Sequence, residues 1–173
     1  MEYRDIIHKK APLPFIGQKR NMLRHIFEVA RNLNRATPIY DVFGGSGLIS
    51  NLFSEMGFKE VYYNDYDGYS NRLTKIEQTN AILDECRNYL NRAGVKADAK
   101  LTDEQRDEVM SILYKYDIID EIDVISLSSR LLFSMRTCTD LNCLAKTTMY
   151  SNIGLSNFNA ERYLAKKKGG GVL

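Results

Sequence analysis

Three glycines within residues 44–47 interrupt an otherwise apolar part of the sequence. Residues 40–50 read Y-D-V-F-G-G-S-G-L-I-S. Glycine inside a strand or helix costs roughly 0.5–1 kcal/mol relative to alanine, so the cluster needs a structural or functional reason. The run forms either an ordinary tight turn or a loop whose bare backbone lets a ligand approach closely.

Two carboxylates near this loop indicate which ligand it could bind. Glycine loops of nucleotide-binding folds face the ligand with backbone amides, and an acidic residue about 20 positions later binds the ribose. Asp65 lies 20 residues after Gly45, and Asp41 precedes the glycines, where a carboxylate suits a cationic amino group better than a pyrophosphate. Because Ser50 replaces the third glycine of the dinucleotide pattern G-x-G-x-x-G, S-adenosylmethionine is favoured over NAD. The alternative for Asp41 is a structural role, in which its carboxylate only accepts hydrogen bonds from the protein at the end of the strand.

The segments around the loop must form the elements that position these groups. Residues 37–43 are typical of a short buried strand, and residues 48–56 predict a helix that ends at Gly57. Residues 60–64, E-V-Y-Y-N, predict a second strand. The order strand, glycine loop, helix and strand is typical of the first half of a parallel α/β sheet.

The remaining sequence predicts mostly helices. An amphipathic helix is expected over residues 19–34 and another over 69–92. The run T-D-E-Q at 102–105 is a capping-box signature for a helix that extends to about residue 116. Residues 121–135 are apolar and predict a further helix, whereas the Thr-, Asn- and Ser-rich sequence after Arg136 predicts an irregular surface region.

Composition narrows the class of protein. The chain has 173 residues, of which 44% are hydrophobic, so it can form one packed domain with a small appendage. A net charge of only +2 does not by itself indicate a nucleic-acid-binding protein. No secretory leader is seen and no apolar run approaches about 18 residues, so we expect a soluble, cytoplasmic protein outside the membrane. Its three cysteines, Cys86, Cys138 and Cys143, are accordingly expected to be reduced, buried side chains rather than metal ligands.

The glycine loop also carries a family resemblance. D-V-F-G-G-S-G, followed downstream by Y-N-D, resembles the cofactor motifs of the Dam-like, D12-class DNA adenine-N6 methyltransferases, whose form is F-x-G-x-G and then N-D. P-F-I-G-Q-K at 14–19 resembles the N-terminal segment that closes over the methionine end of the cofactor. V-F-G-G-S-G-L and Y-N-D-Y-D-G-Y are similar to phage or prophage members. L-L-F-S at 131–134 and residues 149–164 resemble the target-recognition region, so the resemblance extends from Pro12 to Leu164.

The resemblance implies an α/β fold with an incomplete, Rossmann-like SAM-dependent methyltransferase sheet and a mostly helical target-recognition insertion. The cofactor-binding portion would comprise residues 1–68. The target-recognition portion would comprise residues 69–164, followed by a tail at 165–173. The implied reaction is methylation of adenine N6 in double-stranded DNA, although RNA remains open as the substrate.

The resemblance assigns six residues to the cofactor, S-adenosyl-L-methionine. Lys19 would bind its carboxylate, Asp41 its amino group and Asp65 its ribose. Asp67, two residues beyond the strand tip, is the alternative for the ribose. The residues that would shape the loop are Phe43, Gly45 and Gly47.

The catalytic signature of the family is a D-P-P-Y-type motif. Its polar side chain and prolyl carbonyl accept hydrogen bonds from the adenine amino group, and its aromatic ring stacks on the flipped base. The sequence contains only Pro12, Pro14 and Pro38, and no two prolines are adjacent. We therefore assign no catalytic residue and expect the N-terminal part of a methyltransferase, inactive alone. An incomplete sheet exposes an edge, so a complementary C-terminal fragment or self-association is expected.

Candidate DNA contacts lie in the recognition portion. Arg and Asn suit the edges of guanine and adenine, and Lys and Tyr suit phosphates. The alternative to a methyltransferase part is a non-catalytic SAM- or DNA-binding module, or a degenerate relic of such an enzyme. The candidates for DNA contact are Arg130, Arg136, Lys146, Tyr150, Asn152, Asn157 and Arg162.

Overall fold

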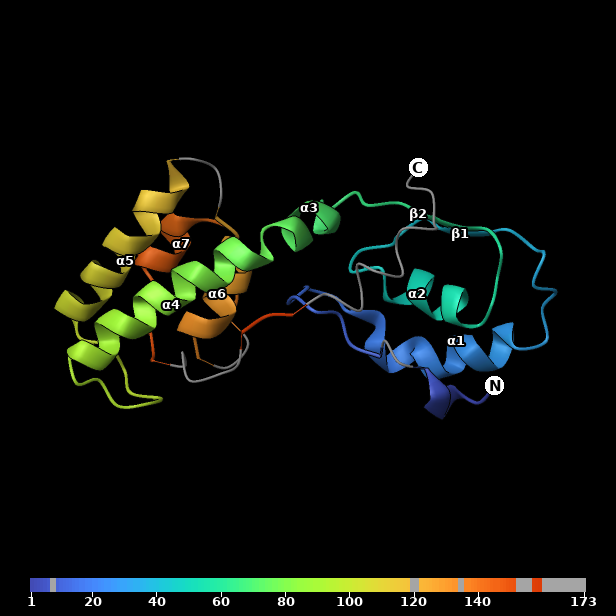
Figure 1. Cartoon of the computed structure of the whole chain (residues 1–173), viewed down its shortest axis with the longest axis horizontal. Coiled ribbons are helices and arrows are strands. Elements are labelled where there is room, and N and C mark those ends of the chain that lie inside the picture. Colours follow the sequence, from blue (N-terminus) through green and yellow to red (C-terminus); the bar gives the residue numbers. More distant parts are fainter. Residues whose placement is uncertain (7–8, 119–121, 134–135, 152–156, 160–173) are drawn as a thin grey trace. The chain divides into compact units, whose positions relative to one another are not determined.

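The computed structural model describes residues 1–6, 9–118, 122–133, 136–151 and 157–159 (Figure 1). Two compact units account for this part of the chain. The first extends from Met1 to Leu73 and the second from Thr74 to Asn159. Within the described ranges, no helix combines the length and the apolar character that crossing a membrane requires.

The first unit contains a small parallel sheet. Strands β1 (Ile39–Asp41) and β2 (Val61–Tyr63) pair in parallel, so that Asp41 lies opposite Tyr63. Helix α2 (Leu48–Glu55) connects them, and Figure 1 shows it between the sheet and α1 (Leu23–Ala30). The predicted order of strand, glycine loop, helix and strand is therefore confirmed, with strands shorter than predicted.

The sheet buries its inward side chains and leaves aromatic side chains exposed on the other side. Val61 and Tyr63 are buried, whereas Tyr40 is 60% exposed. Its ring stacks on that of Tyr62, with centroids 4.8 Å apart. Parallel sheets are ordinarily covered on both faces, so the exposure of Tyr40 beside the half-buried Tyr62 is unusual.

The helix predicted over residues 19–34 is shorter in the structure. Residues Lys19–Met22 form a 3-10 helix, and α1 ends at Ala30. The guanidinium of Arg35 donates to the carbonyls of Ala30 and Arg31, which satisfies the last turn without further helix. The apolar side chains of Met22 and Leu33, within the predicted range of the helix, are exposed.

Helices make up the second unit. The segment predicted as one helix over 69–92 is split at Lys75 into α3 (Tyr69–Thr74), which belongs to the first unit except for its last residue, and α4 (Ile76–Arg92) of the second unit. Helix α5 (Asp103–Asp117) begins with the predicted capping box, in which Thr102 and Gln105 bond to one another's backbone N–H groups. Helix α6 (Val124–Leu131) is shorter than the predicted 121–135 because Leu132 leaves the helix and forms a β-bridge.

The region after Arg136 is more ordered than predicted. It contains helix α7 (Leu141–Ala145), which packs against α5, and its side chains at Leu144 and Met149 are buried. The backbone N–H of Tyr150 donates to the carbonyl of Leu131 over 2.8 Å. The prediction of an irregular surface region is therefore wrong for residues 138–151, because scattered apolar side chains dock onto neighbouring helices.

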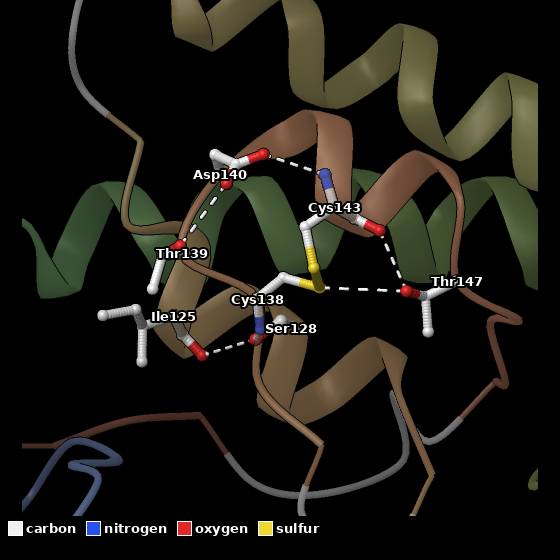
Figure 2. Close-up of a disulfide and its surroundings, with 7 residues drawn as sticks. All are labelled: Ile125, Ser128, Cys138, Thr139, Asp140, Cys143 and Thr147. Carbon is white, nitrogen blue, oxygen red and sulfur yellow. Dashed lines mark hydrogen bonds between the residues drawn. A yellow bond between two sulfur atoms is a disulfide. The ribbon is translucent and has the colours of Figure 1, made fainter.

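The cysteines also differ from expectation. Cys138 and Cys143 form a disulfide with Cα atoms 5.6 Å apart (Figure 2), so the expectation that they are reduced is wrong. The side chain of Asp140 accepts from the N–H of Cys143, and this cap starts α7 and turns Cys143 back over Cys138. Cys86 is free, and burial raises the pKa of its thiol to about 12. Among the described residues, no three His, Cys, Asp or Glu side chains gather as metal ligands.

Candidate functional site

The glycine loop is a tight turn that leads directly into α2. The N–H of Gly47 donates to the carbonyl of Gly44 over 2.8 Å, and Gly45 and Gly47 have positive φ angles of 48° and 70°. A Cβ atom on Gly45 would lie 2.8 Å from the ring of Phe15. The loop is thus both a turn and a place where a neighbouring group must approach bare backbone.

The carboxylate of Asp41 is buried at the start of this loop. The residue is only 8% exposed, and the hydroxyl of Ser50 donates to its Oδ2 over 2.7 Å. Ser50, which breaks the dinucleotide glycine pattern, therefore serves as a hydrogen-bond donor to Asp41. The hydroxyl of Ser50 is a neutral donor, and a buried carboxylate without a cationic partner among the described residues is costly, so this position suits a cationic ligand group.

Asp65 caps helix α3. Its Oδ1 accepts from the N–H of Tyr69 over 2.7 Å and from the hydroxyl of Tyr63 over 2.9 Å, and its Oδ2 accepts from the N–H of Ser70 over 2.8 Å. Burial alone would raise the pKa of Asp65, but hydrogen bonds from Ser70, Tyr63 and Tyr69 outweigh it and hold the pKa below its ordinary value. The side chain of Ser70 also bonds to Asp65, so four donors occupy the roughly four lone-pair sites of a carboxylate, and a ribose hydroxyl would have to replace one of them.

This capping role should make the first unit sensitive to acid. The pKa of Asp65 lies below its ordinary value of 3.8, so its hydrogen bonds stabilise the fold fully above about pH 5 and are lost as the pH falls through the folded-state pKa. Thermal unfolding from about pH 6 to about pH 2.5 should show a larger loss for the wild type than for Asp65→Asn, which does not titrate. If the melting temperatures of the wild type and of Asp65→Asn fell equally with pH, the capping role of Asp65 would be contradicted.

Lys19 lies on the other side of the glycine loop. Its ammonium group donates to the carbonyl of Phe43 over 2.6 Å, while the ring of Phe43 is exposed. Lys19 lines a small pocket of about 10 Å³ together with Phe15, Gly44 and Ser46. Such a volume holds about one water molecule.

Tyr69 anchors the segment that carries Phe15 and Lys19. Its hydroxyl donates to the carbonyl of Leu13 over 3.1 Å and accepts from the N–H of Leu13 over 3.0 Å. The ring of Phe15 packs edge-on against the Tyr69 ring, with centroids 5.7 Å apart. Sequence reasoning missed Tyr69, although it closes the motif Y-N-D-Y-D-G-Y. The structure thus holds Lys19 against the carbonyl of Phe43 beside the glycine loop, whereas Asp67 is exposed.

The candidate DNA contacts of the second unit have different surroundings. The guanidinium of Arg130 lies over the ring of Phe158, 4.3 Å from its centroid, and burial together with the nearby Arg87 lowers the pKa of Arg130. Tyr150 is half-buried against Phe133. Arg130 and Tyr150 therefore have packing roles whether or not they touch DNA. The exposed candidates are Arg136, Lys146 and Asn157, while Asn152 and Arg162 lie outside the described residues.

Comparison with known proteins shows the family of this chain. Residues 15–168 match the family model of the D12 class N6 adenine-specific DNA methyltransferases. The chain is also similar to a Haemophilus influenzae protein provisionally named a methyltransferase, with 34% identity over 163 residues. That match covers 90% of this chain and 54% of the relative, so the chain spans about half the length of the curated relative. No solved structure matches it. The chain therefore belongs to the D12 class of N6 adenine-specific DNA methyltransferases.

Proposed function

We propose that this chain is the cofactor-binding and DNA-recognition part of a DNA adenine-N6 methyltransferase that uses S-adenosyl-L-methionine. One observation carries the proposal beyond family membership. The buried carboxylate of Asp41 ends the strand before the glycine loop, and the ammonium of Lys19 is held at the carbonyl of Phe43. These opposite charges suit the amino and carboxylate groups at the methionyl end of the cofactor.

The space at the loop sets a condition on binding. The ring of Phe15 lies 2.8 Å from the position that a Cβ of Gly45 would take, and the pocket beside it has a volume of only about 10 Å³. The charges therefore fit the cofactor, but the volume does not until Phe15 moves. We propose that the segment from Leu13 to Lys19 opens to admit S-adenosylmethionine and then closes on its methionyl end.

The chemistry requires mainly binding and orientation. When bound, S-adenosylmethionine supplies an activated methyl group for the amino nitrogen of an extruded adenine. That nitrogen is itself the nucleophile, so no covalent enzyme intermediate is needed. Lys19 and Asp41 would orient the cofactor, and Asp65 would accept a ribose hydroxyl in place of one of its present donors. No catalytic residue is assigned, because the sequence has no D-P-P-Y-type motif.

A partner for this part of the enzyme is consistent with its surface. Tyr40, Val42 and Phe43 expose apolar atoms along and beyond β1. We propose that they dock a complementary C-terminal polypeptide or a second copy of the chain. The assembled enzyme would act on double-stranded DNA in the cytoplasm of a bacterium or of a phage-infected host.

Calorimetric titration of the full chain with S-adenosylmethionine tests the cofactor proposal. We expect saturable one-to-one binding, with affinity lowered about tenfold, or about 1.4 kcal/mol, in Asp41→Asn and Lys19→Gln. Glu60→Gln is the matched control, because Glu60 is an exposed carboxylate next to β2 and should leave affinity unchanged. A folded chain that releases no heat would refute cofactor binding.

A second pair of variants decides which carboxylate binds the ribose. Asp65→Asn should weaken S-adenosylmethionine binding, whereas Asp67→Asn should not. The reverse order would transfer the ribose to Asp67, which has no capping bonds to share.

A non-catalytic SAM- or DNA-binding module is the second candidate function. The small pocket and the heavily bonded Asp65 favour it, because both suit a site that is not adapted for turnover. Methyl transfer from labelled S-adenosylmethionine to DNA, measured after addition of the C-terminal half of the Haemophilus influenzae relative, separates the two. Binding without transfer under those conditions supports the module.

A further inference from the structure

The two bonded cysteines differ in exposure. Cys138 is 2% exposed, whereas Cys143, at the centre of α7, is half-buried. Figure 2 shows Thr147 close to the bond on the side of Cys138, with its hydroxyl 3.9 Å from the Cys138 sulfur. A small reagent therefore has better access to the sulfur of Cys143 than to that of Cys138.

Hydrogen bonds hold both cysteines in place independently of the disulfide. The N–H of Cys138 donates to the hydroxyl of Ser128 in α6 over 3.1 Å. The N–H of Cys143 donates to Asp140 over 2.8 Å, and its carbonyl accepts from Thr147 over 2.9 Å. These contacts keep the two sulfurs near one another when the bond is broken, so the disulfide can form again.

We propose that Cys138 and Cys143 are a reversible thiol–disulfide couple in which small thiols and disulfides react at Cys143. This proposal rests on the proposed function, which places the chain with its DNA substrate in the cytoplasm. Disulfides in that compartment are usually transient, because glutathione and thioredoxin keep thiols reduced. Because Cys138 is buried and Cys143 is more accessible, an attacking thiolate should react at the sulfur of Cys143.

The exchange balances with glutathione as the co-reactant. A glutathione thiolate attacks the sulfur of Cys143, a mixed disulfide forms there, and Cys138 leaves as a thiolate that takes a proton from water. A second glutathione thiolate then attacks the glutathione sulfur, releasing glutathione disulfide and the thiolate of Cys143, which is also protonated. The two glutathione thiols thus supply the two electrons, and oxidation by glutathione disulfide is the reverse.

The couple lies among candidate DNA contacts. Arg136 is two residues before Cys138, and Lys146 is three residues after Cys143; both are exposed. Oxidation restrains residues 138–143, which lie between these two side chains in the sequence, whereas reduction leaves them held by hydrogen bonds. We therefore expect DNA affinity to differ about fivefold between the two states, at the lower end of typical coupling between sites.

The test of the couple uses the full chain in buffers of glutathione and glutathione disulfide, followed by alkylation and peptide mass spectrometry. Cys138 and Cys143 should become alkylated together as the buffer becomes reducing. The Cys138→Ser variant should accumulate glutathione on Cys143, whereas Cys143→Ser should carry little on Cys138. Cys86 is the internal control and should remain unmodified in the folded chain, because it is buried and its pKa is raised to about 12. The proposal would be overturned if Cys138 and Cys143 were free thiols in every glutathione buffer. Equal glutathionylation of Cys138→Ser and Cys143→Ser would also overturn it.

Fluorescence anisotropy with labelled duplex DNA tests the consequence. The wild type should change affinity between oxidising and reducing buffers, whereas a variant with serine at both positions should not. Equal wild-type affinities overturn the coupling to DNA. Absence of DNA binding in both states would instead count against the proposed function, and the alkylation pattern would still decide the redox couple.

Discussion

Replacing Gly44 by alanine should destabilise the first unit by about 3 kcal/mol, at the upper end of the usual cost of overpacking. The added Cβ would lie 2.3 Å from two carbons of the Tyr63 ring and 2.7 Å from the carbonyl oxygen of Asn64. Tyr63 cannot move aside easily, because it is buried and its hydroxyl bonds to the Gly45 carbonyl and to Asp65. Urea unfolding followed by circular dichroism measures the loss.

The same substitution should also abolish binding of S-adenosylmethionine, since displacement of Tyr63 disturbs both the loop and Asp65. Gly94→Ala is the matched control in the second unit. Gly94 has a φ of +67° and no atom within 4 Å of an added Cβ, so only the strain of about 1–2 kcal/mol is expected. The affinity of Gly94→Ala for S-adenosylmethionine should equal that of the wild type. A Gly44→Ala protein as stable as the wild type would contradict the packing of Tyr63 on the loop.

The part of the site that the sequence predicted is the part encoded locally. Strand, glycine loop, helix and strand follow from hydrophobic pattern and turn residues within about 30 positions, and that order is confirmed. The partners of the loop could not be predicted in the same way. Phe15 reaches Gly45 from 30 residues away, and Tyr63 reaches the Gly45 carbonyl from 18 residues away. Such contacts depend on tertiary packing, which the hydrophobic pattern of a short sequence segment does not predict.

The spacing of Asp65 after the glycine loop predicted its location near the second strand but not its hydrogen-bond partners. Asp65 lies two residues beyond the end of β2, because the strand is shorter than predicted. Its capping of α3 was not predicted, because the helix expected from Tyr69 onward lacked an identified N-cap. The capping signal was present, since an acidic residue stands shortly before the first helical position. The two roles now compete for the same oxygen atoms.

The errors after Arg136 have a related origin. The sequence there is rich in Thr, Asn and Ser, which favours loops, and this composition concealed the spacing of the apolar residues. Asp140 stands as an N-cap before Leu141 and could have predicted α7. The burial of Met149 could not have been predicted locally, because it depends on a bridge to Leu132, 17 residues earlier.

Tyr69 gives the second prediction of large effect, because one hydroxyl satisfies both backbone groups of Leu13. Leu13 is buried, so Tyr69→Phe would leave its N–H and carbonyl without this partner, and we expect a loss of about 2 kcal/mol. Tyr69→Ala also removes a fully buried ring and should cost about 3–5 kcal/mol. Urea unfolding of the three proteins measures these differences.

Tyr66→Phe is the matched control, because Tyr66 is 90% exposed and lies three residues before Tyr69, ahead of α3. It should change stability by less than about 0.5 kcal/mol. If Tyr69 holds the segment that closes on the cofactor, Tyr69→Phe should lower the affinity for S-adenosylmethionine even where the protein is fully folded. Cleavage by a protease beside Phe15 should then become faster, since the segment is released. Faster cleavage with unchanged affinity would mean that Tyr69 anchors the segment but that the segment does not contact the cofactor. Unchanged cleavage would contradict the anchor itself.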